Sequence, residues 1–178
     1  HLDVTYHPQI IKTKTINKQK DLSIIRDKLS NNKKFNKNKK LKIGYLSSDF
    51  YCHAMMSFVL PIIENHNLEE FDITLYSCRN KEDTVTKRLK NKGVEFKDCS
   101  AMTNKQIAET IYNDYVDILV DLSGYTHNAI WTTLYKPAPI IMQYLGFLGT
   151  YGIKEVDYII ADKFTIPNPK DYTETPLY

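Results

Sequence analysis

The sequence is poor in cysteine: only Cys52, Cys78 and Cys99 occur among 178 residues, and no two have C-x-x-C spacing. An odd count without such spacing argues against a disulfide framework and is typical of reduced thiols in a reducing compartment. No apolar run approaches the ~20 residues that a membrane-spanning helix needs. The start shows no signal peptide, although a sequence that opens at His1 leaves an upstream signal open. We therefore expect a cytoplasmic protein.

Several signatures of phosphate, cofactor and metal binding are also missing. There is no G-x-G-x-x-G dinucleotide fingerprint, and no glycine-rich loop ends in Gly-Lys-Ser/Thr. A G-x-S-x-G nucleophile elbow is absent, and no group of His, Cys and Asp residues has metal-ligand spacing. These absences argue against a simple dinucleotide enzyme, a P-loop protein and an α/β-hydrolase, and we expect neither a cofactor nor a metal.

The net charge of +3 is unevenly distributed along the chain. The stretch Lys12–Lys42 holds 12 of the 24 basic residues and only two acidic ones, Asp21 and Asp27. Basic arms of this kind can bind nucleic acid or an anionic membrane, but no aromatic ladder or nucleic-acid motif accompanies these lysines. We interpret residues 1–40 as a solvated linker with a short helix over Asp21–Ser30, and expect neither nucleic acid nor a membrane as a partner.

From Leu41 onward, segments with strand and helix patterns alternate. Strands are predicted at Leu41–Ser47, Phe71–Ser77, Gly93–Phe96, Val116–Leu122, Ile140–Leu145 and Tyr158–Ala161. Helices are predicted over Met55–Asn65, over Asp83–Asn91, and from Thr103, where Gln106 completes a capping-box pattern. This alternation predicts an open parallel α/β sheet.

Right-handed crossovers place the carboxyl ends of parallel strands on one edge of the sheet, and ligands bind outside those ends. This rule selects three loops: the first loop (Ser47–His53), the second loop (Leu122–Asn128) and the third loop (Leu145–Gly152). In the first loop, His53 can donate, accept or carry a proton. A histidine that only caps backbone groups is an equally good interpretation.

The second and third loops suit a sugar or a phosphate. The second offers consecutive polar groups at Tyr125, Thr126, His127 and Asn128, and the third has three glycines among aromatic residues. A polar turn and a flexible connection remain the alternatives. Asp114 and Asp117 flank the start of a predicted strand. That end of the sheet usually lies away from a ligand, so a structural role is favoured for both.

Three passages together are more specific than any single loop. They are Lys42–Phe50 followed by His53; Asp117–Thr126; and Lys136–Ile140 running through Leu145–Gly152 to Val156–Asp162. Their order and spacing resemble the O-GlcNAc transferase/SPINDLY family, the family 41 glycosyltransferases. Asp83–Leu89 is similar to a segment of its bacterial members. The resemblance runs from about Leu41 to Tyr178.

This resemblance implies a GT-B enzyme with two Rossmann-like lobes that transfers a sugar, usually GlcNAc from UDP-GlcNAc, to Ser/Thr hydroxyls of proteins. Residues 41–178 would be the N-terminal catalytic lobe, and the C-terminal lobe that holds most of the nucleotide would be absent. The segment 1–40 would follow tetratricopeptide (TPR) repeats. On this basis we expect a fragment that is inactive alone, whose partners are a nucleotide-sugar donor and a protein acceptor.

The resemblance also assigns site residues. His53 and Asp114 match family residues discussed as catalytic, Gly149 and Thr150 match the Gly-Thr that lines the sugar pocket, and Tyr125 and Thr126 match a neighbouring binding loop. Two other classes stay open: a non-catalytic α/β binding module, and one lobe of a nucleotide-sugar epimerase. Epimerases lack the passage from Lys136 to Thr150.

Overall fold

The computed structural model describes residues 40–126, 129–147, 149–166 and 168–178. The predicted helix Asp21–Ser30 and nearly all of the predicted linker lie outside the described residues, as do His127 and Asn128 of the second loop and Leu148 of the third.

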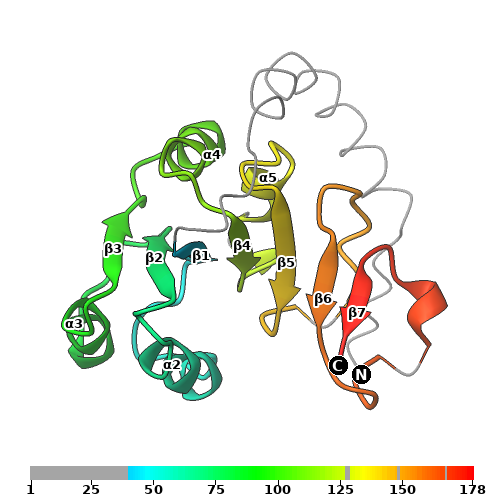
Figure 1. The fold of residues 1–178 in the computed structure, drawn as a ribbon, viewed down its shortest axis with the longest axis horizontal. Coiled ribbons are helices and arrows are strands. Elements are labelled where there is room, and N and C mark those ends of the chain that lie inside the picture. Colours follow the sequence, from blue (N-terminus) through cyan, green and yellow to red (C-terminus); the bar gives the residue numbers. More distant parts are fainter. Residues whose placement is uncertain (1–39, 127–128, 148, 167) are drawn as a thin grey trace.

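A seven-stranded, entirely parallel sheet forms the centre of the chain (Figure 1). Its order is β3-β2-β1-β4-β5-β6-β7. The strands are β1 (Leu41–Ser47), β2 (Phe71–Ser77), β3 (Glu95–Asp98), β4 (Ile118–Asp121), β5 (Ile140–Tyr144), β6 (Tyr158–Ile160) and β7 (Thr175–Leu177). The order reverses at β1: β2 and β3 follow on one side of it, and β4, β5, β6 and β7 follow on the other. The predicted open parallel sheet is confirmed, and its order is Rossmann-like.

Helices cover both faces of the sheet, which is the usual way to bury a parallel sheet. Figure 1 shows α2 (Met56–Glu64) and α3 (Thr84–Lys90) on one face, with α4 (Asn104–Asn113) and α5 (Ile130–Thr133) on the other. Each face has its own cluster of buried side chains. A short 3-10 helix, η2 (Pro169–Asp171), precedes β7. None of the helices in these ranges is long and apolar enough to cross a bilayer.

Local sequence signals placed most elements correctly. The bounds of β1 and β2 agree with the predicted ones, and α4 begins with the predicted capping box between Thr103 and Gln106. The third strand begins two residues later than predicted, because its ladder with β2 starts where Thr74 pairs with Glu95. The elements α5 and β7 were not predicted.

Candidate functional site

The first and second loops meet because β1 and β4 are neighbours in the sheet. The hydroxyl of Ser123 joins them: it accepts a hydrogen bond from Ser48 N–H at 3.2 Å and lies 3.4 Å from the Ser47 hydroxyl. All three serines are fully or almost fully buried. The contact is therefore a fixed part of the carboxyl edge of the sheet.

The third loop packs directly on the second, since β5 lies beside β4. Gly146 makes the closest approach: a Cβ atom there would stand 1.8 Å from the carbonyl oxygen of Leu122. Gly124 has φ +57°, and a Cβ there would lie 2.7 Å from the Cβ of Phe147. The residue before Gly146, Leu145, also has a positive φ of 64°. A bulky residue in that conformation costs energy and is found mainly where the surroundings enforce it. The turn is thus shaped by its packing against β4.

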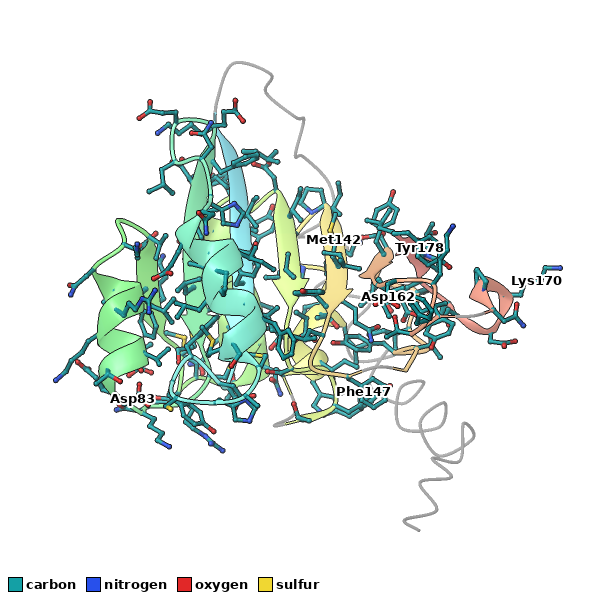
Figure 2. All side chains as sticks on the ribbon, turned by 90° about the horizontal axis from the view of Figure 1, so that it is seen from below. Asp83, Met142, Phe147, Asp162, Lys170 and Tyr178 are labelled. Atoms are coloured by element: carbon teal, nitrogen blue, oxygen red, sulfur yellow. The ribbon has the colours of Figure 1, made fainter. Side chains whose placement is uncertain are left out.

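Aromatic rings form a platform across these two loops. Tyr125 contacts Phe147, Tyr151 and Trp131 edge to face, with ring centroids 5.2, 5.9 and 6.3 Å away. Its hydroxyl donates to the carbonyl of Tyr151 at 2.6 Å. In Figure 2, Phe147 lies at the edge toward which the strand arrows point. Tyr151 is buried, whereas Tyr125, Phe147 and Trp131 are only partly buried. Aromatic surface beside polar main chain suits the mixed polar and apolar surface of a sugar ring.

A buried carboxylate supports the turn after β4. Asp121 is fully buried, and its Oδ1 accepts hydrogen bonds from Ser123 N–H at 2.9 Å and Gly124 N–H at 3.3 Å. Its Oδ2 and the Tyr151 hydroxyl are both buried and have no hydrogen-bond partner among the described residues, although the two side chains affect each other's pKa. Burial raises the pKa of Asp121 from 3.8 to about 6, against the opposing effect of its hydrogen-bond donors.

His53 ends the first loop and is exposed. Its Nδ1 accepts a hydrogen bond from Met55 N–H at 3.3 Å, so in the neutral ring the proton is placed on Nε2. The ring also packs edge to face on Tyr51, at 5.6 Å between centroids. One ring nitrogen therefore binds a backbone group just before α2, as in the capping interpretation. The other nitrogen offers an N–H donor, and a functional role for it remains a prediction.

Two cations that had not been predicted stand beside Tyr51, whose ring packs on His53. The ammonium group of Lys81 lies 4.0 Å from the centroid of the Tyr51 ring, and Arg79 Nη1 donates to the Tyr51 hydroxyl at 2.9 Å. Both residues follow β2, so the rule of strand carboxyl ends would have selected them. Their positive charge favours an anionic group near the first loop.

The first loop is also tied to the start of α3. Cys52 N–H donates to Asp83 Oδ2 at 2.6 Å, and the same carboxylate caps the helix through Val85 and Thr86 N–H. Figure 2 places Asp83 at the same edge of the sheet as Phe147. The carboxyl edge thus carries polar and aromatic groups from β1 across to β5.

The fold and this edge can be compared with known proteins. The profile described as Glycosyl transferase family 41 matches residues 13–177. The chain belongs to glycosyltransferase family 41. The match begins within the predicted linker, so the family profile extends over part of that basic segment.

Relatives of this family 41 chain are much longer than it is. It is 36% identical over 133 residues to the probable UDP-N-acetylglucosamine–peptide N-acetylglucosaminyltransferase SEC of Arabidopsis thaliana, covering 72% of this chain and 13% of that protein. The corresponding SPINDLY protein of Arabidopsis thaliana is 33% identical over 132 residues, 71% of this chain and 14% of the relative. The chain therefore spans about one seventh of these curated relatives.

A solved structure shares the fold. It is a mutant of the O-GlcNAc transferase of Thermobaculum terrenum, with a TM-score of 0.75 and 25% identity. The alignment covers 94% of this chain and 34% of that one. The α/β sheet described here thus corresponds to one part of a larger enzyme, as expected of one lobe of a GT-B glycosyltransferase.

In this family 41 lobe, the structure brings His53, Tyr125, Thr126, Gly149 and Thr150 to one edge of the sheet. The hydroxyls of the two threonines are used internally. That of Thr126 donates to the carbonyl of Ser123, and that of Thr150 donates to Glu174 at 2.7 Å. Their assignment to substrate binding remains a prediction.

Asp114 is not brought to this edge. It follows α4 and precedes β4, so it lies at the amino end of the sheet. Its carboxylate accepts hydrogen bonds from the Tyr76 hydroxyl at 2.7 Å and the Lys97 ammonium at 2.6 Å, and its carbonyl accepts from Lys42 Nζ at 3.0 Å. These contacts fasten the end of α4 to three strands. A catalytic role for Asp114 is supported by the resemblance alone.

Three buried polar residues of the edge were missed: Asp121, Gln143 and Glu174. Each of these side chains is nearly inaccessible to solvent and forms a hydrogen bond with the main chain of a loop. Asp121 and Gln143 were detectable as polar residues within otherwise apolar strands. Glu174 had no local signal, because its partners lie more than 20 residues earlier in the chain.

Proposed function

We propose that this chain forms the sugar-side and acceptor-side wall of an enzyme that transfers GlcNAc from UDP-GlcNAc to Ser/Thr hydroxyls of proteins. The observation that carries the proposal is the convergence of the first, second and third loops at one carboxyl edge, joined through Ser123 and Tyr125. The names of the relatives supply the donor and the acceptor class.

The proposed reaction needs two lobes, of which this chain is one. A second lobe would hold the nucleotide, and TPR repeats ahead of residue 1 would recruit the acceptor. The acceptor oxygen attacks the anomeric carbon of the sugar, the bond to the diphosphate breaks, and the hydroxyl proton leaves. Positioning and electrostatic stabilisation supply most of such catalysis. We infer that the aromatic platform orients the sugar and that His53 Nε2–H donates to an oxygen of the donor. The acceptor proton passes to an oxygen of the departing diphosphate, which balances the step.

The test uses the full-length protein that contains this lobe. We propose that this protein is cytoplasmic. Wild-type protein is incubated with UDP-GlcNAc and a Ser/Thr peptide, and His53→Ala is compared with it. Loss of a positioned imidazole is expected to lower transfer by roughly 100-fold or more. EDTA is expected to leave the rate unchanged, since the proposed reaction uses no metal.

His66→Ala is the matched control. His66 follows α2, and its Nε2 pairs with the Tyr45 hydroxyl at 2.8 Å, away from the three loops. We expect near-normal transfer from this variant. Wild-type transfer by His53→Ala would remove His53 from the site. Donor binding without any transfer by the full-length protein would favour a binding module, and inversion of the donor sugar without transfer would favour an epimerase.

A further inference from the structure

Two buried side chains, Gln143 and Glu174, form hydrogen bonds with the third loop. Gln143, near the end of β5, is fully buried, and its Nε2 donates to the carbonyls of Phe147 and Gly149 at 2.7 Å each. Both carbonyls are therefore drawn inward, toward the sheet. In a planar trans peptide the N–H points away from the carbonyl of the same unit. The N–H of Thr150, which follows the Gly149 carbonyl, must then point away from Gln143.

Glu174 holds the other end of the same segment. It is 2% exposed and lies just before β7. Its Oε1 accepts from Tyr151 N–H at 2.8 Å, and its Oε2 accepts from the Thr150 hydroxyl at 2.7 Å. A buried carboxylate without hydrogen bonds is costly, whereas one that accepts two is a rigid anchor. The end of the third loop is thereby fixed to the strand at the edge of the sheet.

The hydroxyl of Thr150 is fully used by this arrangement. Besides donating to Glu174, it accepts hydrogen bonds from Gly152 N–H at 3.0 Å and Thr173 N–H at 3.2 Å. One donor and two lone pairs are all that a hydroxyl offers. In contrast, no described residue accepts a hydrogen bond from Thr150 N–H. The group that this residue presents to a ligand is its main chain.

We propose that Gln143 and Glu174 are positioning residues that turn the Gly149–Thr150 peptide so that Thr150 N–H, and not its hydroxyl, binds an oxygen of the nucleotide-sugar. This inference rests on the proposed function for the identity of the ligand. The geometry of the loop itself does not depend on it. A main-chain donor held by buried side chains is pre-organised and needs no rotamer search when the ligand binds.

The experiment uses the full-length protein with UDP-GlcNAc as the probe. Hydrogen exchange of residues 145–152 is followed by mass spectrometry with residue-level fragmentation, with and without the donor. In the wild type we expect the donor to slow exchange of the Thr150 amide by about tenfold or more. In Glu174→Gln, the amides of Tyr151 and Gly152 should exchange at least about tenfold faster without ligand, because the acceptor pair that organises them is lost.

Kinetic measurements distinguish a positioning role of Gln143 and Glu174 from a role in stability alone. Glu174→Gln and Gln143→Met are each expected to lower kcat/KM for the donor by about tenfold. The control is Val94→Ala, a buried position beside β3 that is chosen to match their loss in melting temperature. If either positioning variant fails to fold, the other still tests the proposal.

The outcomes are distinct. The proposal is overturned if the donor leaves Thr150 exchange unchanged in an active enzyme, or if both variants match Val94→Ala in kcat/KM. If the wild type transfers no sugar, the proposed function fails by itself. The exchange rates of Tyr151 and Gly152 in Glu174→Gln then still decide whether Glu174 positions the loop.

Discussion

Replacing Asp121 by Asn should change how stability depends on pH, because this buried carboxyl has a pKa of about 6 in the folded chain against 3.8 ordinarily. The folded state therefore holds the proton more tightly than the unfolded state. The stabilisation from the protonated form is fully present below pH 3.8 and is lost as pH rises through about 6. At about 1.4 kcal/mol for each pKa unit, the total is about 3 kcal/mol.

An Asn at position 121 retains a carbonyl oxygen for the N–H groups of Ser123 and Gly124, and its amide can donate to the Tyr151 hydroxyl. It cannot ionise. The unfolding free energy of Asp121→Asn, relative to wild type, should thus rise by about 2.4 kcal/mol between about pH 4 and about pH 7.5. Urea unfolding of the chain at several pH values measures this difference directly. The other carboxylates are the same in both proteins, so their pH-dependent contributions to the free energy of unfolding cancel in this difference.

Asp162→Asn is the control with the opposite sign. Asp162 is exposed, and hydrogen bonds from the N–H groups of Thr165 and Phe164 hold its pKa below 3.8. Its stabilising effect is present at neutral pH and is lost on acidification, so this variant should lose stability relative to wild type as pH rises. The reasoning about the buried carboxyl would be refuted if the unfolding free energies of Asp121→Asn and wild type differed by the same amount from about pH 4 to about pH 7.5.

Two further predictions follow from packing and burial. Gly146→Ala places a Cβ 1.8 Å from the Leu122 carbonyl oxygen, and since main chain cannot rotate away, we expect a loss of about 3 kcal/mol or more; an unchanged urea midpoint would contradict the close packing of the second and third loops. Iodoacetamide at mildly alkaline pH should alkylate exposed Cys52 first, because burial raises the pKa of the Cys78 thiol to about 12 and that of Cys99 to about 11. Peptide mapping that finds all three cysteines modified at one rate in the native chain would count against this.

Some features of the fold were predictable because they depend on short-range patterns. The apolar run of β1 and the alternation in β2 gave the correct bounds, since burial on a sheet imposes those patterns directly on the sequence. The capping box at Thr103 has the same local origin. Parallel strands also require their carboxyl ends to share an edge, so the approximate position of the site followed once the strands were known.

The sequence by itself thus determined the alternation of strands and helices, and with it the edge at which the first, second and third loops meet. Only the tertiary structure decided how individual polar groups are used. Glu174 accepts a hydrogen bond from the Thr150 hydroxyl, 24 residues away in the sequence. The Tyr76 hydroxyl donates to the Asp114 carboxylate, 38 residues away. A polar side chain can bond to many partners, and burial selects the one that leaves fewest groups unsatisfied. That selection depends on the packing of the whole chain and leaves no local periodicity.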